Sequence, residues 1–265
     1  MYHARANANA RTAPAPPADN TAMTDATALL LLPDTLQWLP ASGHAEQLMI
    51  LLHGWGASAE AMAEVALALR REFPQAALLA PQGFEAVDSG LAGRQWFSLA
   101  GTDQAAHAKA LAGALPRLAD WLRAAQAATG LSEAATALVG FSQGALMALE
   151  LAQLHDGIAG RVLSFAGRYV RLPTHALTQT TLHFLHGADD EVIAATESRQ
   201  AVERLAALQG DATIDIVKGV GHALSTELLQ AAVTRLRTHI PHRTWIAAMG
   251  SVPGLADRQQ GGAQD

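Results

Sequence analysis

Short apolar runs alternate with runs of helical periodicity along most of this chain. Strands are expected where an apolar run of about five residues ends at Gly, Pro or a polar residue, and helices where apolar positions recur every three or four residues. The predicted strands are Leu48–Leu52, Ala76–Ala80, Ala137–Phe141, Arg161–Phe165, Thr181–His186 and Thr213–Val217. The predicted helices are Glu60–Arg71, Asp103–Ala128, Gln143–Leu154, Thr196–Leu208 and Leu224–His239. This alternation predicts the α/β class, with a mostly parallel central sheet and helices on both faces.

The pattern defines one domain with a weakly patterned segment at each end. Residues 1–30 are expected to form a disordered N-terminal extension, because the first 22 are rich in Ala, Asn, Arg and Pro without an apolar core. The α/β domain is expected over residues 31–245, and residues 246–265 are expected to be a flexible tail. Within the domain, Pro116 is expected to kink or divide the helix Asp103–Ala128.

Composition narrows the classes of function. Half of the 265 residues are apolar and 16% are charged, which is typical of a globular protein. The net charge of -6 without a basic patch argues against nucleic acid as a partner. The early apolar run Ala28–Leu32 is too short for a transmembrane segment, which needs about 20 residues. The absence of cysteine excludes disulfides and thiolate chemistry, and it fits a reducing, cytoplasmic location.

Ser142 is the strongest candidate for chemistry. The strand Ala137–Phe141 leads into Gly-Phe-Ser-Gln-Gly at 140–144, and a helix follows. This is the pattern of a nucleophile elbow, in which glycines on both sides of the serine avoid clashes with the strand and the helix. A Gly-rich turn without chemical function is the alternative reading of the motif alone.

Two later strand ends supply an acid and a base in the chain order that elbow-type hydrolases use. Asp189 and Asp190 follow the strand Thr181–His186, and His222 lies in a Gly-rich loop after Thr213–Val217. The carboxyl ends of parallel strands lie on one edge of a sheet, so these side chains are expected near Ser142. Neighbouring residues of an extended segment point to opposite sides, and the pattern alone does not say which aspartate faces His222.

Stabilisation of an oxyanion needs two backbone N–H groups. We assign them to Gln143, at a helix N-terminus, and to Trp55, in the segment His-Gly-Trp-Gly that follows the first predicted strand. Gly54 would let this loop approach the substrate closely.

Four further side chains have both a functional and a structural reading. Trp96 and Phe97 lie in a Gly-rich loop region and could form the wall of an acyl pocket or belong to the core. His53 and His186 each precede a glycine at a strand end. We favour a structural role for both over a metal pair, because no metal-binding pattern accompanies them. The expected chemistry uses no metal and no other cofactor.

Several segments together resemble the phospholipase/carboxylesterase family. The resemblance spans Leu48 to Pro241 and rests on His53-Gly54-Trp55-Gly56, Gly140-Phe141-Ser142-Gln143-Gly144, His186-Gly187-Ala188-Asp189-Asp190 and Gly221-His222. The segments Gly93-Arg94-Gln95-Trp96-Phe97-Ser98 and Phe165-Ala166-Gly167-Arg168-Tyr169 are similar to those of a bacterial esterase subgroup.

The resemblance implies an α/β-hydrolase fold without a large cap domain. It also implies Ser142 as nucleophile, His222 as base and Asp190 as acid, because the family's acid lies three residues after the Gly of His-Gly. Ala57 stands where thioesterases of the family often have Asp.

We therefore expect a serine carboxylesterase that acts on a small-molecule or lipid-like ester through an acyl-enzyme on Ser142. An acyl-thioesterase or a lysophospholipase with the same triad is the alternative within enzymes. A non-catalytic binding protein with the same fold is the alternative from another class. For the assembly of the protein, we consider a homodimer.

Overall fold

A computed structural model describes residues 32, 34–90, 92–100 and 104–250. The predicted N-terminal extension and the part of the predicted tail from residue 251 onward lie outside the described residues.

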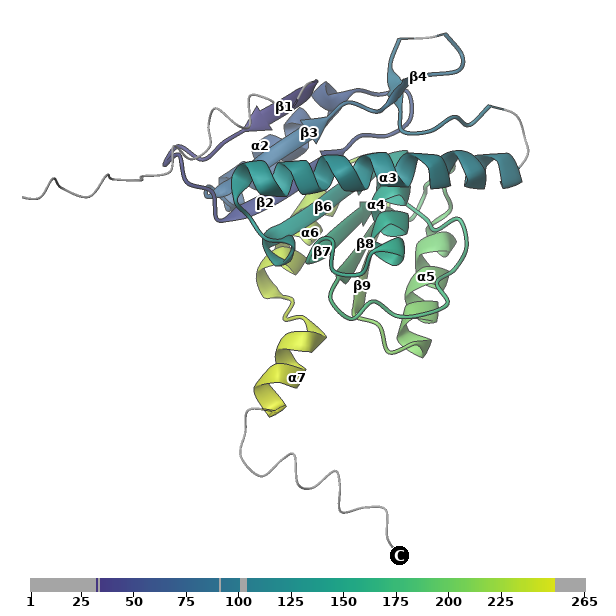
Figure 1. Cartoon of the computed structure of the whole chain (residues 1–265). Helices are drawn as coiled ribbons and strands as arrows, with labels where there is room; N and C mark the ends of the chain where they lie inside the picture. The colour runs from purple at the N-terminus through teal and green to yellow at the C-terminus, as the bar shows by residue number, and fades with distance from the viewer. Residues whose placement is uncertain (1–31, 33, 91, 101–103, 251–265) are drawn as a thin grey trace, which may run out of the picture.

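A seven-stranded sheet forms the centre of the fold (Figure 1). Its order is β1-β3-β2-β6-β7-β8-β9, and every neighbouring pair is parallel except β1 and β3. The strands are β1 (Thr35–Trp38), β2 (Gln47–Leu52), β3 (Ala76–Pro81), β6 (Thr136–Phe141), β7 (Arg161–Phe165), β8 (Thr181–Gly187) and β9 (Ala212–Val217). The predicted mostly parallel sheet is confirmed.

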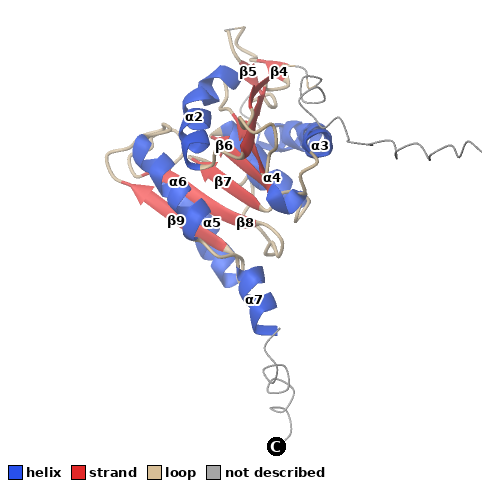
Figure 2. Ribbon diagram, turned by 90° about the vertical axis from the view of Figure 1, so that its left-hand side faces the viewer, coloured by secondary structure: helices blue, strands red, loops and turns tan. Residues whose placement is uncertain are grey.

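Helices cover both faces of the sheet, as predicted (Figures 1 and 2). One face packs against α3 (Gln104–Thr129), α4 (Gln143–Leu154) and α5 (Ala195–Ala207), and the other against α2 (Ala63–Glu72) and α6 (Thr226–Thr238). Strand β2 shows the division, because Leu48, Ile50 and Leu52 belong to the first core and Met49 and Leu51 to the second. Such alternation follows from the two-residue period of a strand.

The expected division of the helix at Pro116 is wrong, because α3 runs as one helix through this residue (Figure 1). Proline removes a single backbone hydrogen bond and crowds one carbonyl. The buried residues Leu115, Leu118 and Leu122 hold the same helix on the core on both sides of that point. We attribute the continuity of α3 to this packing.

Short elements complete the fold and differ from the sequence pattern. The predicted helix at 60–71 is a 3-10 turn, η1 (Ala59–Met62), followed by α2, and η2 (Glu133–Ala135) precedes β6. Two-residue strands β4 (Glu85–Ala86) and β5 (Arg94–Gln95) pair in the long loop before α3. Helix α7 (His242–Gly250) leads away from the sheet and occupies positions where the flexible tail was expected to begin (Figure 1).

The chain between β7 and β8, residues 166–180, contains no helix, in keeping with the expectation of no large cap domain. None of the helices among the described residues has the length and apolar character that crossing a bilayer requires.

Candidate active site

Ser142 occupies a strained turn between β6 and α4. Its backbone φ is 53° and its ψ is −115°, a conformation that residues other than glycine rarely adopt. A Cβ on Gly140 would lie 2.5 Å from Cα of Ala145, and one on Gly144 would overlap the carbonyl of Leu52. Both glycines are therefore required sterically, because the elbow presses the helix against the two strands beneath it.

The carboxyl ends of three strands bring Ser142, His222 and Asp190 into one hydrogen-bonded row. Nε2 of His222 lies 2.9 Å from Oγ of Ser142, and Nδ1 lies 2.8 Å from Oδ2 of Asp190. The ring of Phe141 packs beside the imidazole, with centroids 5.0 Å apart. Ser142 follows β6, Asp190 follows β8 and His222 follows β9.

Close contact between two loops places Asp190 beside His222. A Cβ on Gly187 would overlap the carbonyl of Val220, so only glycine allows the end of β8 to pack against the loop that carries His222. The N–H of Asp189 donates to the carbonyl of Val220 at 3.0 Å, and its Oδ2 accepts from the N–H of Gly219 at 2.8 Å. Asp189 thus holds the loop, whereas Asp190 contacts the imidazole.

The Asp190 carboxylate is buried and stabilised as an anion. Its Oδ1 accepts from the backbone N–H groups of Val192 and Ile193, each at 2.9 Å. Burial alone would raise the pKa of Asp190. The hydrogen bonds from Ile193, His222 and Val192 outweigh that effect and hold the pKa below its usual value. A fixed anion at this position favours the His222 tautomer with a hydrogen on Nδ1, which leaves Nε2 to accept from the serine.

The two segments that carry the expected oxyanion donors lie next to the serine. Gln143 is the first residue of α4, where the backbone N–H has no partner within the helix. On the other side, a Cβ on Gly54 would lie only 3.4 Å from Cβ of Ser142, so the loop with Gly54 and Trp55 is packed against the elbow. Trp55 is 43% exposed, and its indole Nε1 donates to Oε1 of Gln95 at 2.9 Å.

The expected acyl-pocket wall of Trp96 and Phe97 is not what the structure shows, because both side chains are buried in the core. Their backbones instead hold the side chain of Gln143. The N–H of Trp96 donates to Oε1 of Gln143 at 2.9 Å, and Nε2 of Gln143 donates to the carbonyl of Phe97 at 2.8 Å. The Trp96 indole N–H donates to the carbonyl of His53 at 2.8 Å. Trp96 and Phe97 therefore hold the side chain of Gln143, and Trp96 also holds the backbone at His53.

His53 fixes the loop that carries Trp55. Its Nε2 accepts from the N–H of Gly83 at 2.9 Å, so Nδ1 carries the hydrogen and donates to the carbonyl of Gly54 at 2.7 Å. Burial lowers the pKa of His53, and the nearby positive charge of Arg94 adds to the effect, although the bond to Gly54 opposes it. Both ring nitrogens are therefore used within the protein.

His186 is also fully engaged, with Nδ1 2.7 Å from Oγ of Ser198 and Nε2 2.8 Å from the carbonyl of Ile193. Neither this histidine nor His53 has a free nitrogen for a metal ion. Among the residues that the structure describes, no group of three or more metal-ligating side chains is gathered in one place.

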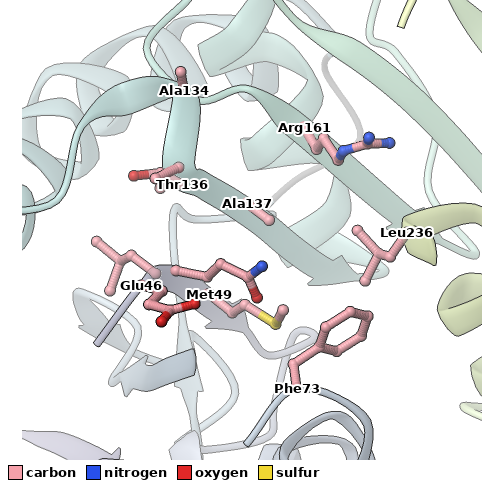
Figure 3. Close-up of a pocket in the computed structure, with 11 residues that line it drawn as sticks. Glu46, Met49, Phe73, Ala134, Thr136, Ala137, Arg161 and Leu236 are labelled. Atoms are coloured by element: carbon pink, nitrogen blue, oxygen red, sulfur yellow. The ribbon is translucent and has the colours of Figure 1, made fainter. Parts of the chain in front are cut away.

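A separate cavity of about 350 Å³ opens at the opposite end of the strands (Figure 3). It is lined by the first residues of β2 and β6 together with Phe73, Arg161 and Leu236. Because the strands are parallel, this cavity lies at their amino ends, whereas Ser142 lies at the carboxyl end of β6. It therefore contributes no group to the hydrogen-bonded row.

A mostly parallel sheet with a strained serine after a central strand, and with an aspartate and a histidine after the last two strands, defines the class of α/β-hydrolase enzymes. Residues 39–240 match the phospholipase/carboxylesterase family, and the chain belongs to it. It is thus a hydrolase.

Proteins named as esterases or carboxylesterases are similar to this chain over most of its length. Esterase YpfH of Escherichia coli (strain K12) is 39% identical over 214 residues, which cover 80% of this chain and 92% of that protein. The crystal structure of esterase PE8 is similar with a TM-score of 0.72 and 29% identity, covering 78% of this chain and 99% of that one. A carboxylesterase from Mesorhizobium loti shares the fold, with a TM-score of 0.60 and 22% identity over 77% of this chain and 90% of that one.

Proposed function

We propose that this protein is a serine carboxylesterase that hydrolyses carboxylic esters through an acyl-enzyme on Ser142. One observation carries the proposal: a continuous row of hydrogen bonds leads from Oγ of Ser142 through His222 to Asp190. The names of the similar proteins, which include esterases and a carboxylesterase, support the ester as the substrate class.

In the first half of the reaction, Oγ of Ser142 attacks the ester carbonyl while Nε2 of His222 takes the serine proton. The backbone N–H groups of Trp55 and Gln143 stabilise the negative oxygen of the tetrahedral intermediate. This intermediate collapses when the imidazolium gives its proton to the leaving alcohol. The acyl group then remains on Ser142.

In the second half, water attacks the acyl-enzyme and His222 takes the water proton. The second tetrahedral intermediate collapses to release the carboxylic acid, and the proton returns to Ser142. Asp190 keeps Nδ1 of His222 protonated and stabilises the imidazolium in both halves. Every proton moves through His222, so the proposed mechanism needs no cofactor.

The proposed substrate is a small-molecule or lipid-like ester. A thioester or a lysophospholipid would meet the same nucleophile, base and oxyanion donors, so the leaving group and the acyl length have to be measured. The exposed indole of Trp55 gives the loop beside Ser142 an apolar surface, which suits an acyl or alkyl group. The cytoplasmic location and the homodimer are predictions from the sequence alone.

The proposal is tested by hydrolysis of p-nitrophenyl esters from acetate to palmitate, with thioester analogues of matched chain length alongside. Ser142→Ala is the control, because it removes only the nucleophilic oxygen. We expect turnover that falls by several orders of magnitude in this variant while its circular dichroism is unchanged. A fluorophosphonate should label the parent protein and not the variant. Ester turnover that survives Ser142→Ala would refute the mechanism, and absence of both turnover and labelling would favour a non-catalytic binding protein.

A further inference from the structure

A second histidine contacts the carboxylate of Asp190 from inside the protein. Nε2 of His186 lies 3.2 Å from Oδ2 of Asp190, the same oxygen that faces His222. The His186 side chain is completely buried, and the His222 side chain remains 17% exposed. Oδ2 is therefore placed between two imidazole rings, one on the side of the serine and one on the side of the core.

The neighbours of His186 determine where its hydrogen lies. Nε2 faces two atoms that can only accept, the carbonyl oxygen of Ile193 at 2.8 Å and the carboxylate oxygen of Asp190. Nε2 must therefore carry a hydrogen whatever the charge of the ring. On the other side, Nδ1 lies 2.7 Å from Oγ of Ser198, whose hydroxyl donates to it when the ring is neutral.

These contacts join three elements at the acid. His186 comes from β8, Ser198 from α5 and Ile193 from the loop between them. The Ile193 N–H donates to Oδ1 of Asp190, and the Ile193 carbonyl accepts from His186. The ring therefore fixes the turn after Asp190 through Ile193 and at the same time lies against one carboxylate oxygen.

We propose that His186 is a positioning residue for the reaction. Its Nε2–H holds the carbonyl of Ile193, and with it the turn that binds Oδ1 of Asp190, while the ring lies against Oδ2 and keeps that oxygen in line with Nδ1 of His222. This inference rests on the proposed function, since it assigns a partner to the acid of that mechanism. His186 does not reach the substrate, and it acts only through Asp190. Without it, the turn at Ile193 and the inner side of Oδ2 lose their support, and the carboxylate can rotate away from His222.

Charged groups near the carboxylate are few, which makes the contribution of His186 separable. Among the described residues, the titratable side chains recorded in contact with Asp190 are His222 and His186. The neighbouring Asp189 is directed to the N–H of Gly219. The effect of a change at position 186 on the site is therefore read out in the hydrogen bond between Asp190 and His222.

The experiment compares His186→Leu with His186→Gln in the full chain. Leucine fills the space but has no donor, whereas the glutamine amide places an N–H near the position of Nε2. In the leucine variant we expect kcat for p-nitrophenyl acetate to fall about tenfold to a hundredfold, a loss typical of removing an orienting partner. We expect KM to change by less than about twofold, because substrate binding is not involved. Glutamine should restore most of kcat.

Proton NMR supplies a readout that does not depend on turnover. The downfield N–H resonance of His222, which reports its bond to Asp190, should be present in the parent and in His186→Gln and broadened or lost in His186→Leu. Ser198→Ala is the milder variant if leucine prevents folding, because it frees Nδ1 and leaves the ring in place. It should lower kcat by a smaller factor, again without changing KM.

Three results would overturn the inference: parental kcat in a folded His186→Leu, equal losses in the leucine and glutamine variants, or parental kcat in Ser198→Ala. Failure of the proposed function gives a different result, since the parent protein would then lack Ser142-dependent turnover while the NMR comparison would still report on His186.

Discussion

The carboxylates of Asp189 and Asp190 belong to neighbouring residues but hold different parts of the same loop. Asp190 contacts the imidazole of His222 at 2.8 Å, and Asp189 accepts from the N–H of Gly219 at 2.8 Å. The two residues lie in and just after the turn that follows β8, and their side chains reach different partners: Asp190 contacts the imidazole, while Asp189 fixes the backbone that carries it.

This division of roles predicts opposite sensitivity to the same substitution. Asp190→Asn should lower kcat by about 10⁴, because an amide N–H facing Nδ1 favours the wrong tautomer of His222. Asp189→Asn keeps an oxygen that can accept from the N–H of Gly219, so it should lower kcat by less than about tenfold. Steady-state kinetics on one ester compares the two variants directly. A larger loss in Asp189→Asn would mean that the acid is misassigned.

The elbow predicts that two glycines in helices respond differently to alanine. A Cβ on Gly144 would overlap the carbonyl of Leu52, so Gly144→Ala should lower the free energy of unfolding by about 1–3 kcal/mol and reduce turnover. Gly113, in the exposed face of α3, has nothing within 4 Å of an added Cβ. Gly113→Ala should therefore raise the free energy of unfolding by about 0.5–1 kcal/mol. Urea denaturation measures both, and midpoints that move in the same direction would contradict the steric argument.

The side chain of Gln143 is predicted to matter separately from its backbone N–H. Gln143→Leu leaves the buried N–H of Trp96 and carbonyl of Phe97 without a partner, which should cost about 1–3 kcal/mol of stability. It should also lower kcat about tenfold, since the first turn of α4 is no longer held against the loop. Gln230→Leu, at an exposed position of α6, is the matched control. The same loss in both variants would show that the contacts of Gln143 are not responsible.

A buried histidine far from Ser142 predicts how stability depends on pH. His183 has its Nε2 3.1 Å from the guanidinium of Arg161 and its ring beside that of His239, with Asp211 also nearby. Burial, reinforced by Arg161, lowers its pKa to about 3 from 6.5. At a pH between these two pKa values, His183 is protonated in the unfolded chain and neutral in the folded protein.

The free energy of unfolding should therefore fall as pH decreases below about 6.5, with a slope of about 1.4 kcal/mol per pH unit from this residue. In His183→Gln the slope should be smaller by that amount, although the variant is less stable at neutral pH. Chemical denaturation at several pH values between 4 and 8 makes the comparison. Parallel slopes in the two proteins would exclude His183 as the cause.

The parts of this fold that the sequence predicts are those in which a strong pattern and the packing agree. The boundaries of α4 follow from the motif at 140–144, because the same glycines that make the turn possible also end the strand. In contrast, β1 has four half-buried residues at the antiparallel edge of the sheet, and such a segment has no marked periodicity.

The limits at the site have similar physical causes. Only resemblance to a family distinguishes Asp190 from Asp189 in the sequence, since a pattern of residues does not contain the path of a loop in space. Trp96 and Phe97 lie in a polar segment, which suggested an open pocket. The segment folds back so that its backbone bonds Gln143 and its side chains are buried. The two hydrogen bonds that hold the side chain of Gln143 come from Trp96 and Phe97, which precede it by 47 and 46 positions. Contacts over such a separation leave no local signal in the sequence.

The last strand of the sheet also sets when the site can exist during folding. Ser142 and His222 are 80 residues apart, and the loop with His222 follows β9, which pairs only with β8 at the edge of the sheet. Closing so long a segment is entropically costly and belongs to the slow contacts of a folding chain. A nascent or refolding chain can thus build its elbow and most of its core before Ser142 and His222 meet, so recovery of turnover in refolding would report the pairing of β9 with β8.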